Sequence, residues 1–388
     1  MVRVLYVLDH DEMCGGVVQA VETIVRNGRA HGVKAAVFVP HSKGETAIAM
    51  QNAGAEVFAF EKPFVYKKTK PIRSLRSLIC FARRLKEVIT TFKPDVIETN
   101  HATAETFTSF GQKIIRNTIP RVFCQRGNPV IYRGLSSSAL RLALRSVNAV
   151  ISVSPFPDEV YSQMLRIPSE RLVCITDCVT SQEFQLDDSG RHESDALRKI
   201  WQCKPDDVLV GILGFISPNK NQAMLIESAR EISRTIDHAK FILIGTCLST
   251  QYYNQIVTKT TDYDLQDHVT FAGFVDKHKA IPALDIVVSL SHCEGFGLSI
   301  LEAGVCGKPV IATQSGGPNY IIRDGVNGYL IPRDDVFMLA KCLTTLIDDP
   351  ALRNTMGEAG KKIAKMEYDP DDKIISRIKL YERLCNYL

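Results

Sequence analysis

The stretch Ser291-His-Cys-Glu-Gly-Phe-Gly-Leu-Ser-Ile-Leu-Glu-Ala-Gly-Val-Cys-Gly-Lys-Pro309 decides how this chain is organised. An apolar run, Ile286–Leu290, precedes it and predicts a buried strand. Glu294–Gly297 then predicts a glycine turn, and Leu298–Ala303 the first turns of a helix. A strand, a glycine turn and a helix in this order are typical of a site that binds an anion.

The chemistry of this turn gives the reason. Glycines let a ligand approach the backbone closely, and the free N–H groups at a helix start attract a phosphate. Glu294 lies before the predicted helix and Glu302 lies about one turn inside it. We therefore predict an anion site with one carboxylate on each side.

Predicted strands and helices alternate along the whole chain, which favours an α/β fold with parallel, helix-covered sheets. A polar segment, Asp187–Asp195, interrupts the alternation, and a new strand begins at Val208. We expect an N-terminal domain over residues 1–180 and a C-terminal domain over 181–365. A last helix over 366–388 is expected to cross back to the N-terminal domain.

Composition narrows the protein class. The 388 residues are 45% hydrophobic and 23% charged, which is ordinary for a soluble globular protein of two domains. The apolar runs are too short to span a bilayer, and the N-terminus lacks a signal-peptide pattern, so we expect a cytoplasmic protein. The 11 cysteines are scattered without CxxC pairs, which indicates unlinked thiols in a reducing compartment.

Positive charge is concentrated in the first half. Residues 1–180 contain 24 Lys and Arg against 15 Asp and Glu, whereas the remainder contains 23 against 28. The segment 62–86 alone holds nine Lys and Arg. It reads either as a helix with a solvated basic face that covers the sheet, or as a contact for an anionic membrane or acceptor.

Polar residues follow several predicted strands, at the edge where open α/β sheets bind ligands. Gly15 and Gly16 lie in the first loop, before a helix. Glu98, Asn100 and His101 end the strand that begins near Lys93, and Arg126 ends a later one. For the histidine a structural role is about as probable as a functional one. The arginine suits a phosphate fork, and a loop ion pair is an equal alternative.

The second half offers one more cation. A strand ends at Gly214, and Ser217–Asn221 is expected to open a helix, with Lys220 at its start. A lysine at the positive end of a helix is unfavourable unless it faces an anion. Zinc-type Cys/His spacing, H-E-x-x-H, the P-loop and G-x-S-x-G are absent from the sequence, as are nucleic-acid modules, so no metal site is predicted.

Taken together, these residues resemble the retaining GT-B glycosyltransferases of family 4, also called glycosyl transferases group 1. Glu294-Gly-Phe-Gly-Leu-Ser-Ile-Leu-Glu302 is similar to the E-x7-E motif of that family. Ser315-Gly-Gly317 and Asp324–Leu330 continue the resemblance, which covers nearly the whole chain. It implies the GT-B fold, with two Rossmann-like domains whose parallel sheets face a central cleft.

The resemblance also implies roles for individual residues. Glu302 would hold the ribose of a nucleoside diphosphate sugar, and Glu294 would contact the transferred sugar. Backbone around Gly297 and Leu298 would hold the diphosphate with Lys220. The expected catalytic residues are Glu294, Lys220, His101 and Asn100. The expected donor-binding residues are Gly15, Gly16, Gly214, Lys220, Phe274, Val275, Glu294, Gly295, Phe296, Gly297, Leu298 and Glu302. Arg126 and Glu98 are the acceptor or phosphate candidates, and neither a metal nor a cofactor is expected.

Several positions depart from the pattern of the family. Phe215 stands where the family usually has an arginine, and Glu98-Thr-Asn100 replaces a His-x-His pattern. Arg126 stands at a position that is often histidine, and Asp177-Cys178 replaces Asn-Gly. These departures indicate an unusual acceptor or donor rather than a different fold.

The resulting expectation is a retaining, metal-independent hexosyltransferase. It would move a sugar from a UDP- or GDP-linked donor to a glycan or lipid-linked acceptor in cell-surface polysaccharide biosynthesis. Contact with the inner face of an anionic membrane is a further expectation, and a nucleic-acid partner is not. Two alternatives remain open: a sugar-nucleotide epimerase or hydrolase of the same fold, and a non-catalytic subunit that binds a nucleotide sugar.

Overall fold

The computed structural model describes residues 1–9, 16–62, 71–127, 135–155, 165–184 and 188–386. Contacts divide the chain into two compact units. Unit 1 consists of Met1–Cys178 together with Pro370–Leu388, and unit 2 consists of Val179–Asp369.

Unit 1 is built on a parallel sheet with the strand order β3-β2-β1-β4-β5-β6-β7. The strands are β1 (Val2–Val7), β2 (Val33–Val39), β3 (Glu56–Ala59), β4 (Val96–Thr99), β5 (Arg121–Gln125), β6 (Ala149–Ser152) and β7 (Leu172–Cys174). The helices are α1 (Gly16–Gly28), α2 (Glu45–Asn52), α3 (Pro71–Phe92), α4 (Ala102–Ile115), α5 (Leu135–Leu144) and α15 (Pro370–Asn386).

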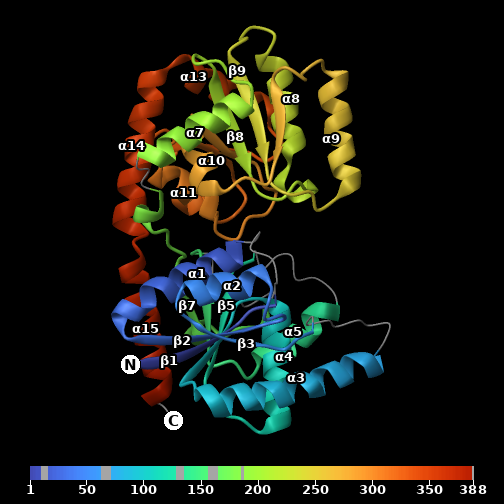
Figure 1. Ribbon diagram of the computed structural model, residues 1–388, viewed down its shortest axis with the longest axis vertical. Coiled ribbons are helices and arrows are strands. Elements are labelled where there is room, and N and C mark those ends of the chain that lie inside the picture. Colours follow the sequence, from blue (N-terminus) through green and yellow to red (C-terminus); the bar gives the residue numbers. More distant parts are fainter. Residues whose placement is uncertain (10–15, 63–70, 128–134, 156–164, 185–187, 387–388) are drawn as a thin grey trace. The chain divides into compact units, whose positions relative to one another are not determined.

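Helices cover both faces of this sheet (Figure 1). On one face, Phe81 of α3 stacks on Phe38 of β2 with ring centroids 5.3 Å apart, and Phe107 of α4 joins the same cluster. On the other face, α1 packs against the C-terminal helix α15. Burial of this kind supplies about 25 cal/mol per Å² of apolar surface, which is why the strand sequences are almost entirely apolar.

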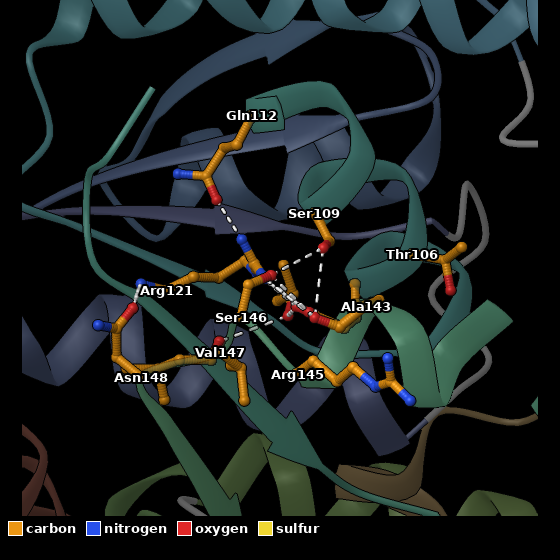
Figure 2. A network of polar contacts seen from close by, with 12 residues as sticks. Thr106, Ser109, Gln112, Arg121, Ala143, Arg145, Ser146, Val147 and Asn148 are labelled. Carbon is orange, nitrogen blue, oxygen red and sulfur yellow. Dashed lines mark hydrogen bonds and ion pairs between the residues drawn. The ribbon is translucent and has the colours of Figure 1, made fainter. Parts of the chain in front are cut away.

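A buried polar network lies at the amino-terminal end of β5, around Arg121 (Figure 2). Nε of Arg121 lies 3.0 Å from both carboxylate oxygens of Glu105, and Nη2 donates to Oγ of Ser146 at 3.0 Å. Nη1 donates to Oε1 of Gln112, so every nitrogen of this guanidinium has a partner. Burial raises the pKa of Glu105, and the neighbouring guanidinium opposes that shift. This network is complete in itself and is structural.

Unit 2 repeats the plan with the strand order β10-β9-β8-β11-β12-β13. The strands are β8 (Val208–Leu213), β9 (Ala239–Ile244), β10 (Val269–Gly273), β11 (Ile286–Ser289), β12 (Val310–Thr313) and β13 (Gly328–Ile331). The helices are α7 (Asp188–Ile200), α8 (Gln222–Ile232), α9 (Thr250–Asp262), α10 (Lys277–Ala283), α11 (Leu298–Val305), α12 (Pro318–Ile321), α13 (Val336–Asp348) and α14 (Pro350–Glu367).

The α/β class with parallel sheets is therefore confirmed. The ends of unit 2 meet, because the backbone N–H of Val179 donates to the carbonyl of Tyr368 at 3.4 Å. Within the described residues, none of the helices combines the length and the apolar character that a membrane span requires.

Candidate functional site

The turn Glu294–Gly297 connects β11 to α11 and is held by a second glycine turn. The backbone N–H of Glu294 donates to the carbonyl of Ser315 at 2.9 Å, and the N–H of Gly317 donates to the carbonyl of Glu294 at 3.1 Å. A Cβ on Gly317 would lie 2.1 Å from the carbonyl oxygen of Phe296, so only glycine fits there. Gly297, with φ +107°, directly precedes the first helical N–H groups. The two turns thus fix the start of α11 in backbone contact.

Glu294 is paired with a lysine. Nζ of Lys220 donates to Oε2 of Glu294 at 2.7 Å, and Oγ of Ser291 donates to the same oxygen at 3.0 Å. Burial alone would raise the pKa of Glu294, but the charge and hydrogen bond of Lys220, with Ser291, hold that pKa below its ordinary value. The carboxylate is therefore ionised at neutral pH.

The local backbone conformation explains how Lys220 reaches Glu294. The expected helix start at Ser217–Asn221 is wrong in detail: residues Pro218–Lys220 form a 3₁₀ turn, and α8 begins only at Gln222. Asn221 between them has φ +53°, a left-handed conformation that asparagine tolerates. Gly214, with φ +127°, leaves room for the lysine stem, because a Cβ there would lie 3.3 Å from Cε of Lys220.

A second lysine–carboxylate pair involves α11 itself. Glu302, only 4% exposed, forms an ion pair with Nζ of Lys277, the first residue of α10. The side chain of Asp276 accepts a hydrogen bond from the backbone N–H of His278 at 3.0 Å and so caps that helix. Sequence reasoning missed Lys277. The signal that singled out Lys220, a lysine at a helix start, would also have found it.

The remaining predicted donor residues of unit 2 lie in this turn, at the start of α11 and after β10. Gly295 and Phe296 are buried, and Phe296 packs on Tyr368 with ring centroids 5.8 Å apart. Leu298 begins α11 and is partly buried. At the end of β10, Phe274 is 67% exposed and Val275 is partly buried.

Phe215 is partly buried, and its carbonyl accepts a hydrogen bond from Nε2 of Gln222 at 3.0 Å. Its ring supplies no cation where the family pattern has an arginine.

In unit 1 the predicted residues have different surroundings. Gly16 is exposed and is the first residue of α1, whereas Gly15 lies outside the described residues. Nδ1 of His101 lies 2.7 Å from Oδ2 of Asp9, which follows β1. His101 directly precedes α4. Asp9 was not predicted from the sequence, although an acid just after the first strand is a recognisable signal.

Glu98 lies beneath the C-terminal helix. Its side chain is fully buried, Nη1 of Arg377 donates to its Oε2 at 2.8 Å, and the hydroxyl of Tyr381 donates to the same oxygen. Both partners belong to α15. Glu98 therefore anchors α15 to the sheet, and its carboxylate is not available at the surface.

Asn100 and Arg126 contact each other. Nε of Arg126 donates to Oδ1 of Asn100 at 3.0 Å, and Nη1 pairs with Asp177. All three residues are buried. The structure therefore brings Asn100 and Arg126 together, with Asp177 as a partner that sequence reasoning recorded only as a departure from the family pattern. Among the described residues, no group of three or more His, Cys, Asp and Glu side chains is arranged to hold a metal ion.

Comparison with known families gives two matches that lie side by side along the chain. Residues 14–182 match the family described as Glycosyltransferase Family 4. Residues 193–363 match the family described as Glycosyl transferases group 1.

Individual relatives match over part of their length. EpsD of Bacillus subtilis (strain 168) is 32% identical over 44% of this chain and 45% of its own. N-acetyl-alpha-D-glucosaminyl L-malate synthase of Bacillus anthracis is 29% identical over 44% of both chains. The chain thus spans about half the length of these curated relatives. The solved structure of Anabaena HepE in complex with UDP-glucose has 21% identity and a TM-score of 0.83, and the alignment covers 99% of this chain and 100% of HepE.

Proposed function

Because this chain belongs to the GT-B glycosyltransferases of family 4, we propose that it transfers a sugar from a nucleoside diphosphate sugar to an acceptor. The observation that carries the proposal is the pair of lysine–carboxylate contacts, Lys220–Glu294 just before α11 and Lys277–Glu302 within α11. A diphosphate needs cations and N–H donors, and sugar hydroxyls need carboxylate acceptors. The two ion pairs and the start of α11 supply the cations, the N–H donors and the carboxylates.

We assign the donor as follows. The N–H groups at Gly297 and Leu298 and the ammonium of Lys220 would hold the diphosphate. Glu302 would accept hydrogen bonds from the ribose, and Glu294 from the transferred sugar. Arrival of the diphosphate gives each lysine a second anionic partner, so the lysines can turn towards it from their present carboxylates. We propose a UDP- or GDP-linked donor. HepE, which shares the fold, is bound to UDP-glucose in its solved structure, and this supports the UDP-linked choice.

The proposed reaction retains the configuration at the anomeric carbon. The bond between that carbon and the diphosphate oxygen breaks, and a new bond to the acceptor hydroxyl forms on the same face. The proton of the hydroxyl passes to the departing phosphate. Lys220 and the start of α11 stabilise the charge that develops on the leaving group. His101 and Asn100 are the proposed catalytic residues of unit 1.

A binding panel tests the donor assignment. Incubation with UDP- and GDP-linked sugars should raise the melting temperature for at least one donor, because a ligand of the folded state stabilises it. Lys220→Ala should abolish the shift, whereas Lys259→Ala, which removes a lysine from a pair with Glu227 in the same unit, should not. If no nucleoside diphosphate sugar shifts the wild type, the proposal is wrong.

The chemistry needs its own measurements. Proton NMR of the product should show the anomeric configuration of the donor. We propose a metal-independent enzyme, so activity should persist in EDTA. Rapid turnover of donor without acceptor would favour an epimerase or hydrolase, and donor binding without transfer to any acceptor would favour a non-catalytic subunit.

We also propose a cytoplasmic protein that touches anionic lipid through α3, in keeping with cell-surface polysaccharide synthesis. Two apolar side chains of α3 are exposed, Leu75 at 58% and Ile79 at 36%. Arg76, Arg83 and Lys86 on the same helix are also exposed. Apolar residues among basic ones are typical of a membrane-surface helix. Three further basic residues of the segment, Lys67, Lys68 and Lys70, lie outside the described residues.

Sedimentation with vesicles tests this contact. The protein should pellet with anionic vesicles at low salt and not with neutral ones, and the double variant Leu75→Ser/Ile79→Ser should weaken binding. Leu248→Ser, at a leucine of unit 2 that is 63% exposed, is the matched control. Failure to pellet with anionic vesicles at low salt would remove the proposal.

A further inference from the structure

Four buried charges form a continuous chain in unit 1. Arg377 lies 2.8 Å from Glu98 and 4.0 Å from Asp177, and Asp177 pairs with Arg126. Each of these side chains is at most 4% exposed. Acid and base alternate, so the charges balance without a ligand. Because each buried charge is costly without its neighbour, the chain of contacts fixes the guanidinium of Arg126 in place.

Hydrogen bonding, unlike charge, is incomplete along this chain of contacts. Oε1 of Glu98 and Nε of Arg377 are buried without a partner among the described residues, on side chains that α15 covers or carries. Two further donors are open at the Arg126 end. Nη2 of Arg126 and Nδ2 of Asn100 are buried and have no hydrogen-bond partner among the described residues. Arg121 offers the contrast, because all three of its guanidinium nitrogens have partners at the other end of the same strand. A buried donor without a partner is unfavourable by about 1–3 kcal/mol relative to a satisfied one. Two such donors on residues in contact indicate a place built for a shared acceptor.

The position of these donors fits ligand binding. Asn100 and Arg126 directly follow β4 and β5, which are neighbouring parallel strands. Parallel sheets bind ligands at the carboxyl ends of their strands. Gly127, the next residue, is only partly buried, so this end of β5 comes close to the surface. Glu98, by contrast, is covered by α15, whose Arg377 and Tyr381 both donate to it.

We propose that Arg126 and Asn100 form a recognition site for an anionic oxygen group, a phosphate or a carboxylate, on the acceptor. The proposal rests on the function proposed above. A guanidinium favours such groups because its fork matches their geometry. The amide of Asn100 adds a neutral donor beside it. Asp177 is a positioning residue: it occupies Nη1 and thereby leaves Nη2 for the ligand.

Charge and relatedness both support an anion over a neutral sugar. The first 180 residues carry the basic excess of the chain, which favours an anionic partner for unit 1. The name of the relative from Bacillus anthracis specifies L-malate, a dicarboxylate.

The test uses two probes, inorganic phosphate and L-malate, titrated into the full-length protein by calorimetry. Every variant is made in a Lys220→Ala background, which weakens anion binding at the start of α11. Asn100→Asp is the decisive change: the aspartate still accepts the bond from Nε of Arg126 but replaces the open donor with a negative charge. The double variant Arg126→Gln/Asp177→Asn removes the ion pair while keeping amide hydrogen bonds. Arg323→Gln, from an exposed pair with Glu367, is the control.

At least one probe should bind the Lys220→Ala background, and its affinity should fall about tenfold or more in both site variants but not in the control. Binding of phosphate alone or malate alone identifies the anion class. If both site variants bind as the background does, or if neither probe binds the background, the proposal is overturned. Near-ultraviolet circular dichroism establishes that each variant is folded. Donor binding by the wild-type protein is measured separately, and its absence would count against the proposed function and not against this site.

Discussion

Lys220 donates a hydrogen bond to Glu294 across 2.7 Å, although 74 residues separate them in sequence. The contact joins the loop after β8 to the loop after β11 at the same edge of one sheet. It places a cation beside the first turn of α11 before any ligand is bound. This preorganised cation is the basis of the first two predictions.

Removing either partner should impair transfer much more than folding. We expect Lys220→Ala and Glu294→Gln each to lower kcat by about 100-fold or more, because Lys220 would stabilise the charge on the leaving diphosphate and Glu294 would position the transferred sugar. Steady-state kinetics with the donor found by the binding panel provides the measurement. Lys259→Ala and Glu227→Gln disrupt a lysine–glutamate pair of the same unit and should leave kcat unchanged. Wild-type rates in both site variants would contradict the assignment.

The pH dependence of stability should report the same contact. The pKa of Glu294 is lowered in the folded protein, so its ionised form adds stability at pH values above the unfolded pKa, and that stability is lost as pH falls through the folded pKa. The difference in melting temperature between wild type and Glu294→Gln should therefore be constant above about pH 5 and shrink below the ordinary carboxyl pKa of 4.5. Calorimetry from pH 7 to pH 3 measures it. A difference that grows on acidification would show that the pKa is not lowered.

Lys277 should matter for the donor more than for the chemical step. It pairs with Glu302, the proposed ribose ligand, whereas Lys220 pairs with Glu294. We expect Lys277→Met to raise the KM for donor by about tenfold, the effect of one charge-assisted hydrogen bond, with kcat changed much less. Lys279→Met, two residues further along α10 in an exposed pair with Glu193, is the control. An unchanged donor KM would remove Lys277 from the site.

The anchor of the C-terminal helix should be essential for stability. Arg377→Met leaves Glu98 buried without its cation and should lower the free energy of unfolding by about 3–5 kcal/mol. Replacing both partners, Glu98→Leu/Arg377→Met, should cost less than the single change. Urea unfolding gives the values. Arg323→Met, from an exposed pair, should cost less than about 1 kcal/mol. A single-variant loss as small as that of the control would argue against a structural anchor.

The sequence predicted what local patterns can encode. The apolar run before Glu294 and the glycines after it define the strand, the turn and the helix start of α11, because all their determinants are adjacent. Lys220 was predicted at a helix start, but the left-handed Asn221 that separates it from α8 was not, since that conformation depends on the surrounding backbone.

Ion pairs between residues far apart in sequence could not be predicted from local patterns. Lys277 lies 25 residues from Glu302, and Arg377 lies 279 residues from Glu98. No periodicity links residues at these separations. Glu98 and Arg126 were both read as candidates for ligand contact because both follow strands. Only the position of α15 distinguishes them: the helix covers Glu98, whereas Arg126 keeps a donor without a partner.

The hydrogen bond between Val179 and Tyr368 affects how the two units of this protein can be separated by protein engineering. Unit 2 is inserted in sequence between the two segments of unit 1. The first residue of unit 2 and its penultimate residue are hydrogen-bonded to each other. Simple truncation after Cys178 would discard α15 and expose the apolar surface under it. Excising Val179–Asp369 and joining Cys178 to Pro370 through a short flexible linker would instead preserve every strand and helix of unit 1. The molecule is thus suited to domain grafting, with unit 2 as the exchangeable module.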